Sequence, residues 1–95
     1  MYFALVLETE GFEFLIDTRE LWQPARVYVR RGPDISGVWL DEDDVSFMTP
    51  SRLRPAEPEQ ALALVRAHLD DLLDAWCSLK DDVFRGRLGR NLLVE

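Results

Sequence analysis

The sequence predicts an α+β fold, in which a small antiparallel sheet of about four strands carries one long amphipathic helix packed on one face. Hydrophobic residues in the first forty positions alternate with a period of two and are interrupted by turn signals, which is typical of strands. Later in the chain they recur at steps of three and four, which is typical of a helix. The length of 95 residues fits one domain, assigned to residues 1–82, followed by a C-terminal tail at residues 83–95.

Four strands are predicted from the alternation and the turns. Residues 2–8 are nearly all apolar, which predicts a strand that is buried on both faces or central in the sheet. Gly11 marks a tight turn, because glycine accepts the positive φ that hairpin turns require. Residues 12–17 alternate cleanly, and residues 26–30 and 35–40 form a second hairpin around a Gly-Pro-Asp turn.

The second half of the chain predicts a helix after a proline-containing loop. Residues 45–48 form a short extended piece, and Pro58 followed by Glu59 has the character of a helix start. Helical spacing of apolar residues then continues for about 20 residues. The predicted apolar stripe consists of Leu62, Val65, Leu69, Leu72, Trp76 and Leu79. The sheet residues expected beneath it are Phe12, Phe14, Ile16, Val27, Val29, Val38 and Leu40.

Charge and composition limit the class of protein. The chain has 11 basic and 18 acidic residues, a net charge of −7, which disfavours broad electrostatic binding to nucleic acid or anionic membranes. No apolar run approaches the ~20 residues that span a bilayer, and the first residues lack a signal-peptide pattern. The single cysteine, Cys77, excludes an intramolecular disulfide and fits a reducing compartment. We therefore expect a cytoplasmic protein without membrane association.

The second hairpin carries the main candidate site. Alternation places three polar or aromatic residues of its first strand on the side away from the helix, and the expected register puts Trp39 opposite Arg26. Arginine and aromatic side chains together bind an anion, a planar base or an acidic partner through bidentate hydrogen bonds and stacking. With a tryptophan from the preceding loop, the candidate partner-binding residues are Arg26, Tyr28, Arg30, Trp39 and Trp22.

The arginines of this strand also have a purely structural interpretation. Glu13 and Asp17 are expected on the same side of the neighbouring strand. Arg26 and Arg30 then complete surface ion pairs, which contribute little to stability or recognition.

No motif indicates an active site, a metal site or a cofactor. The acidic run at residues 41–44 lacks the glycine and the glutamate that an EF-hand loop requires at later positions. His68 is the only histidine, and Cys77 lies too far along the helix to share a ligand set or a catalytic pair with it. The chain has no P-loop, dinucleotide fingerprint or zinc pattern. We expect no catalytic residues, no metal and no cofactor.

Two stretches of the chain together resemble a known family. Residues 68–76 read His-Leu-Asp-Asp-Leu-Leu-Asp-Ala-Trp and resemble the closing helix of the domain of unknown function 4160 family, a small bacterial family. Arg26 and Tyr28 stand where that family carries two signature histidines. The positions that match the family's preceding hairpin are Gly11, Phe12, Phe14, Pro24, Val27, Val29, Gly32, Trp39, Leu40 and Asp41.

The resemblance implies a strand-rich fold with a closing helix and a bacterial or phage cytoplasmic setting. Small families of this kind often occur in toxin–antitoxin-like pairs, so it also implies a protein partner. Our leading hypothesis is a non-enzymatic protein-binding or regulatory module that binds a protein partner or a second copy of itself. The alternatives are a nuclease-type toxin that uses Arg26 and Tyr28 with nearby carboxylates, and a nucleic-acid-binding module that uses the Arg26–Arg31 strand.

The C-terminal tail differs from the rest of the chain in charge. Residues 83–95 carry three arginines against one glutamate, and several apolar residues accompany them. Gly86 and Gly89 disfavour continuation of the helix. We predict that the tail docks on its own sheet or on a second molecule.

Overall fold

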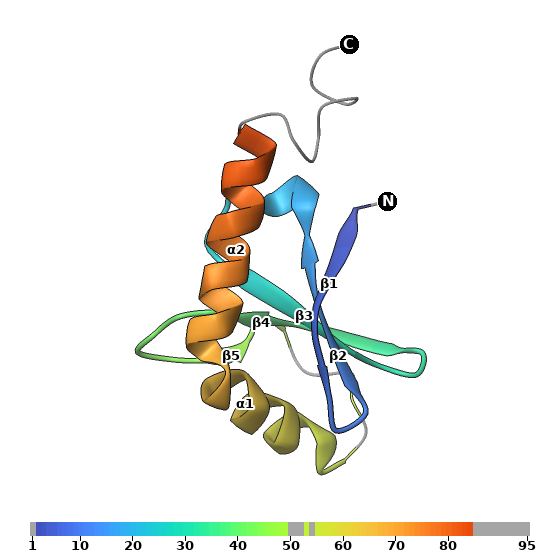
Figure 1. Cartoon of the computed structure of the whole chain (residues 1–95). Helices are drawn as coiled ribbons and strands as arrows, with labels where there is room; N and C mark the ends of the chain where they lie inside the picture. Colours follow the sequence, from blue (N-terminus) through green and yellow to red (C-terminus); the bar gives the residue numbers. More distant parts are fainter. Residues whose placement is uncertain (1, 50–52, 54, 85–95) are drawn as a thin grey trace.

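Within residues 2–49, 53 and 55–84, which a computed structural model describes, the chain forms a five-stranded antiparallel sheet with two helices on one face (Figure 1). The strands lie in the order β1-β2-β3-β4-β5, so each one pairs with its neighbour in the sequence. The elements are β1 (Phe3–Thr9), β2 (Phe12–Asp17), the 3₁₀ turn η1 (Thr18–Glu20), β3 (Arg26–Arg31), β4 (Asp34–Trp39), β5 (Ser46–Phe47), α1 (Glu57–Ala67) and α2 (Leu69–Phe84). The predicted α+β class is confirmed.

Strand β1 is an edge strand, so the prediction that it is central or buried on both faces is wrong. It pairs only with β2 among the described strands, and its Leu5 side chain is 53% exposed. A β-bulge between Leu5 and Leu7 shifts its register against β2. The β1–β2 hairpin closes through Glu10 and Gly11, which both have positive φ as a two-residue turn requires. The apolar composition of residues 2–8 does not distinguish a central strand from an edge strand that exposes apolar side chains such as Leu5.

The second hairpin has the predicted register. Arg26 pairs with Trp39, and Arg30 pairs with Ile35. The short extended piece joins the sheet as β5, which pairs with β4 through Ser46 and gives the sheet five strands where about four were expected.

The stretch predicted as one helix is two helices that meet at His68. This residue leaves helical geometry, with φ −113° and ψ 20°, although its N–H still donates to the Leu64 carbonyl at 3.0 Å. Its own carbonyl accepts the N–H of Leu72 at 2.9 Å, so helical hydrogen bonding resumes at once. The change of direction lets α1 and α2 cover different parts of the sheet. Helix α2 continues to Phe84, two residues beyond the predicted domain boundary, and residues 85–95 lie outside the described residues.

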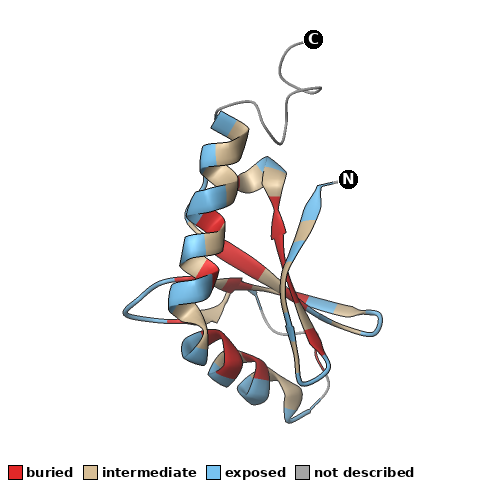
Figure 2. Cartoon of the chain, viewed as in Figure 1, coloured by how far each residue is buried: buried red, intermediate tan, exposed pale blue. Residues whose placement is uncertain are grey.

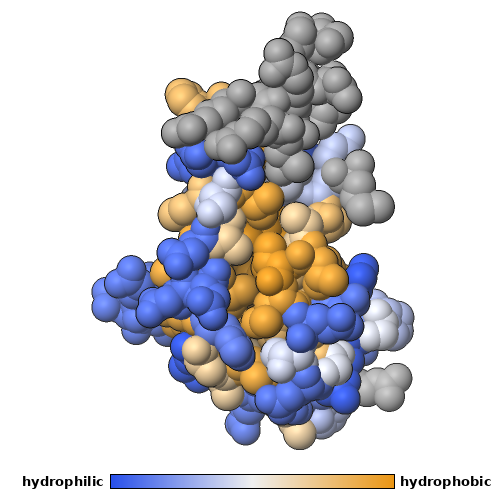
Figure 3. Space-filling model, viewed as in Figure 1, coloured by the Kyte–Doolittle hydropathy of each residue, from blue (hydrophilic) through white to orange (hydrophobic). Residues whose placement is uncertain are grey.

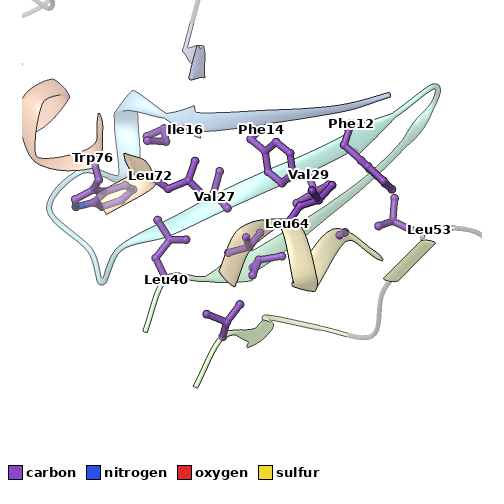
Figure 4. Packing of buried hydrophobic residues seen from close by; sticks show 14 of the residues in the cluster. Phe12, Phe14, Ile16, Val27, Val29, Leu40, Leu53, Leu64, Leu72 and Trp76 are labelled. Carbon is purple, nitrogen blue, oxygen red and sulfur yellow. The ribbon is translucent and has the colours of Figure 1, made fainter. Parts of the chain in front are cut away.

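The core lies between the helices and one face of the sheet (Figure 2). All seven sheet residues expected beneath the helix are buried, and Trp76 is only 5% exposed. Leu62, Leu69 and Leu79 of the predicted stripe are only partly buried, and Ala61 and Leu64 of α1 are buried in addition. Figure 4 shows Trp76 at the Ile16 end of the sheet, so α2 covers that end. These contacts cover one face of the sheet, and no helix of the described residues covers the other.

Candidate functional site

The outer face is the side of the sheet opposite the two helices. Side chains alternate between the two faces of a strand, so the residues that lie between the buried ones point to this side. The strand registers align these residues in rows across the sheet. Leu5 pairs with Leu15, Leu15 with Tyr28, and Tyr28 with Gly37. The outer face consists of Phe3, Leu5, Glu8, Glu13, Leu15, Asp17, Arg26, Tyr28, Arg30, Ile35, Gly37, Trp39 and Ser46. Four of the five predicted site residues therefore lie together.

Tyr28 is at the centre of this face. Its hydroxyl donates a hydrogen bond to Glu20 Oε1 at 2.7 Å, and the Phe3 ring meets its ring edge to face with centroids 5.7 Å apart. Burial, together with the Glu20 carboxylate, raises the pKa of Tyr28. The phenol therefore stays protonated at neutral pH and acts as a hydrogen-bond donor in a fixed orientation.

Gly37 leaves room for the side chain of Met48, which is not among the predicted site residues. A Cβ at this position would lie 2.6 Å from Met48 Sδ and 3.2 Å from a ring carbon of Tyr28. The Met48 N–H donates to the Gly37 carbonyl at 2.9 Å, which fixes the residue beside β4. Met48 thus extends the apolar part of the outer face, and its signal in the sequence is the glycine inside a strand.

Arg26 is held within the protein. Arg26 is only 8% exposed, and its guanidinium lies over the Trp39 ring, 4.9 Å from the ring centroid. Its Nε donates to the Pro24 carbonyl at 3.2 Å, and Nη1 lies 3.8 Å from Glu20 Oε1. Arg26 therefore orients Trp39 and Glu20, in keeping with its structural interpretation, although its carboxylate partner is Glu20 and not the predicted Asp17.

Asp17 pairs with a different arginine, Arg19 in η1. Its Oδ1 accepts hydrogen bonds from the main-chain N–H and the Nε of Arg19 at 2.9 and 3.0 Å, and its Oδ2 lies 2.7 Å from Nη2. These hydrogen bonds from Arg19 lower the pKa of the Asp17 carboxyl. Strand alternation does not predict this pairing, because it is the 3₁₀ turn η1 that brings Arg19 back to Asp17, two residues earlier.

Arg30 forms the predicted surface ion pair. Its Nε donates to Glu13 Oε1 at 2.8 Å, and both side chains are partly exposed. The pair lies at the hairpin end of the outer face, where it borders Ile35.

Trp22 is not part of the outer face. It lies against α2, where Lys80 Nζ is 5.2 Å from its ring centroid, and it lines a shallow apolar hollow with Cys77 and Phe84. Its side chain remains 60% exposed. The structure therefore separates Trp22 from the other four predicted site residues, because the loop after η1 turns toward the helix.

The acidic run after β4 forms a turn. Asp41 Oδ1 accepts the N–H of Asp43 at 2.9 Å, and the Asp41 carbonyl accepts the N–H of Asp44 at 3.2 Å. Together with Trp39 this turn lines an open cavity at the end of the sheet. Within the described part of the chain, no group of three or more histidine, cysteine or carboxylate residues has the geometry to hold a metal ion.

Comparisons with protein-family models, curated proteins and solved structures gave no match for this chain. The resemblance to the domain of unknown function 4160 family therefore stays a prediction. Among the described residues, neither helix has the length and apolar character needed to cross a membrane.

Proposed function

We propose that the chain is a non-enzymatic protein-binding or regulatory module that acts through the outer face of its sheet. The observation that carries this proposal is an apolar surface on a sheet face that no described helix covers. Leu5, Phe3 and Ile35 are 53%, 39% and 37% exposed on this face. Exposed apolar patches of this kind on small proteins are typical of sites that bind another protein.

The arrangement of polar groups supports the same function. The apolar centre, formed by Phe3, Leu5 and Tyr28 with neighbouring residues, is flanked by two ion pairs, Glu13–Arg30 and Asp17–Arg19. A fully desolvated apolar centre with a polar rim is the common anatomy of protein interfaces.

The aromatic side chains are preorganised for binding. Tyr28 is fixed by its hydrogen bond to Glu20, and Trp39 is fixed beneath the Arg26 guanidinium. Rigid aromatic side chains lose little conformational entropy on binding, which is why they are frequent at the centres of interfaces. The guanidinium groups of Arg26 and Arg30 already interact with carboxylates. Recognition therefore depends on apolar and aromatic contacts, and a protein suits this surface better than a nucleic acid does.

The setting of this function follows from the resemblance described above. We place the protein in the bacterial or phage cytoplasm, with a second short protein as its partner in a toxin–antitoxin-like pair. Arg26 and Tyr28 would then orient contact residues where the family carries its two histidines.

Purification from the native host tests the proposal. A tagged chain should retain one stoichiometric protein partner, and Trp39→Ala should weaken that complex by at least about tenfold in Kd, because truncation of an aromatic residue that anchors an interface typically costs more than about 1.4 kcal/mol of binding. Trp22→Ala is the matched control, since it removes an exposed tryptophan from a different surface. Equal loss in both variants, salt-sensitive oligonucleotide binding or metal-dependent nucleic-acid cleavage would contradict the proposal.

A further inference from the structure

The two edges of the sheet are unequal. Strand β5 has only two residues, whereas β1 has seven and carries no proline or lysine. Glu8 is its only charged residue. Monomeric proteins usually protect a sheet edge by keeping it short or by placing charges and prolines on it, since a long neutral edge pairs with other chains. Within the part of the chain that the structure describes, the bulge is the only such protection on β1.

Apolar exposure is concentrated at this edge. Of the six exposed large hydrophobic side chains among the described residues, three belong to the start of the chain: Tyr2, Phe3 and Leu5. Val6 and Leu7 are only partly buried against the core. Figure 3 shows hydrophobic side chains reaching the surface between β1 and the hydrophilic residues of α2. The β1 edge is thus apolar on both sides of the sheet.

Backbone groups at the edge are correctly oriented for pairing. The Tyr2 carbonyl accepts the Thr18 N–H at 2.7 Å, which turns the polar groups of Tyr2 toward β2. Alternation along an antiparallel ladder then turns the N–H and C=O groups of Phe3 toward the free edge, and those of Leu5 likewise. A strand laid against β1 would satisfy these groups.

Charge along β1 indicates which strand fits. The Arg19 guanidinium lies over the Tyr2 ring, 4.2 Å from its centroid, at the N-terminal end of the strand. The exposed Glu8 lies near the C-terminal end. When two copies of β1 pair antiparallel, the partly exposed Arg19 of each copy, which also pairs with its own Asp17, comes beside Glu8 of the other, and both contacts form by symmetry.

We infer that two copies of the chain associate through β1 about a two-fold axis, which joins their sheets into one continuous antiparallel sheet. Phe3 packs on Tyr28, so β1 adjoins the outer face directly. The dimer therefore joins two outer faces into one wide surface. This last consequence rests on the proposed function, whereas the pairing of β1 does not.

Mass measurement on the full-length chain tests the association. Light scattering after size exclusion should give twice the 11.0 kDa chain mass at micromolar concentration. Leu5→Lys should raise the dimer dissociation constant by at least about tenfold, because a charged side chain on an edge strand disfavours pairing. Ile35→Lys makes the same change at the far side of the outer face, and it should leave the dimer intact while weakening partner binding. A monomer at every concentration, or a Leu5→Lys dimer of unchanged affinity, overturns the inference.

Hydrogen exchange on the unmodified chain gives a result that does not depend on whether the variant folds. The amides of Phe3 and Leu5 should exchange fast in dilute solution and slowly in concentrated solution. Fast exchange under both conditions excludes pairing at this edge. Slow exchange under both conditions assigns the edge to a segment of the same chain and equally overturns the inference.

Discussion

The two faces of the sheet are built from the same strands but differ in what covers them. On the inner face, Phe14 and Val29 are fully buried beneath the helices. On the outer face, one residue along each strand, Leu15 is buried, Tyr28 is half-buried and Leu5 is exposed. Because side chains alternate along each strand, core packing and surface exposure fall on opposite faces of the same sheet. The inner face forms the hydrophobic core with the helices, and the outer face leaves several apolar and aromatic side chains partly exposed.

The largest effect is expected on the inner side. Trp76→Ala should lower the free energy of unfolding by about 3–5 kcal/mol, because it removes a buried aromatic side chain and leaves a cavity. Urea denaturation measures the change. Trp22→Ala is the control, since this tryptophan is 60% exposed, and it should cost less than about 0.5 kcal/mol. A loss below about 1 kcal/mol for Trp76→Ala would show that α2 does not stabilise the sheet.

Arg26 tests whether any part of the outer face contributes to stability. Arg26→Ala should cost about 1–3 kcal/mol, because it removes a largely buried side chain and its hydrogen bond to the Pro24 carbonyl. The variant should also release Trp39, which near-ultraviolet circular dichroism and tryptophan fluorescence report. Unchanged stability together with an unchanged spectrum would show that Arg26 neither stabilises the fold nor orients Trp39.

The Asp17–Arg19 pair should make the free energy of unfolding depend on pH. Its pKa is lowered in the folded protein, so the pairing with Arg19 contributes fully above about pH 4 and is lost as the pH falls through the folded-state pKa. The difference in unfolding free energy between wild type and Asp17→Asn should therefore be constant at neutral pH and shrink in acid. Denaturation series between pH 7 and pH 2 measure it. A difference that stays the same over this range would contradict the pairing.

The smallest effect is expected at Arg30, on the same strand and face as Arg26. Its ion pair with Glu13 is exposed to solvent, and water screens such pairs. Arg30→Ala should leave the denaturation midpoint within experimental error of wild type at physiological salt. A loss as large as that of Arg26→Ala would mean that exposure does not distinguish the two arginines.

Much of the fold was predictable because alternation and turn signals are local. The register of the second hairpin follows from its turn, which placed Trp39 opposite Arg26 and Ile35 opposite Arg30. The inner face followed from the same alternation. The Glu13–Arg30 pair was predictable too, since it needs only the faces of two adjacent strands.

Other features depend on contacts that the sequence does not display. The edge position of β1 depends on strand order, which an apolar run cannot indicate. The break at His68 has no glycine or proline to mark it. Trp22 follows η1, and its loop turns to α2 and away from the outer face. The predicted docking of the tail falls largely on residues 85–95, which lie outside the described residues.

Hydroxyl-radical footprinting of the partner complex compares both sides of the molecule in one measurement. If the outer face binds the partner, the side chains of Tyr28, Ile35 and Trp39 should become protected, while Trp22 and Phe84 react as they do in the free chain. Protection of Trp22 and Phe84 with unchanged reactivity of Trp39 would place the partner on the helix side and contradict the assignment of function to the outer face.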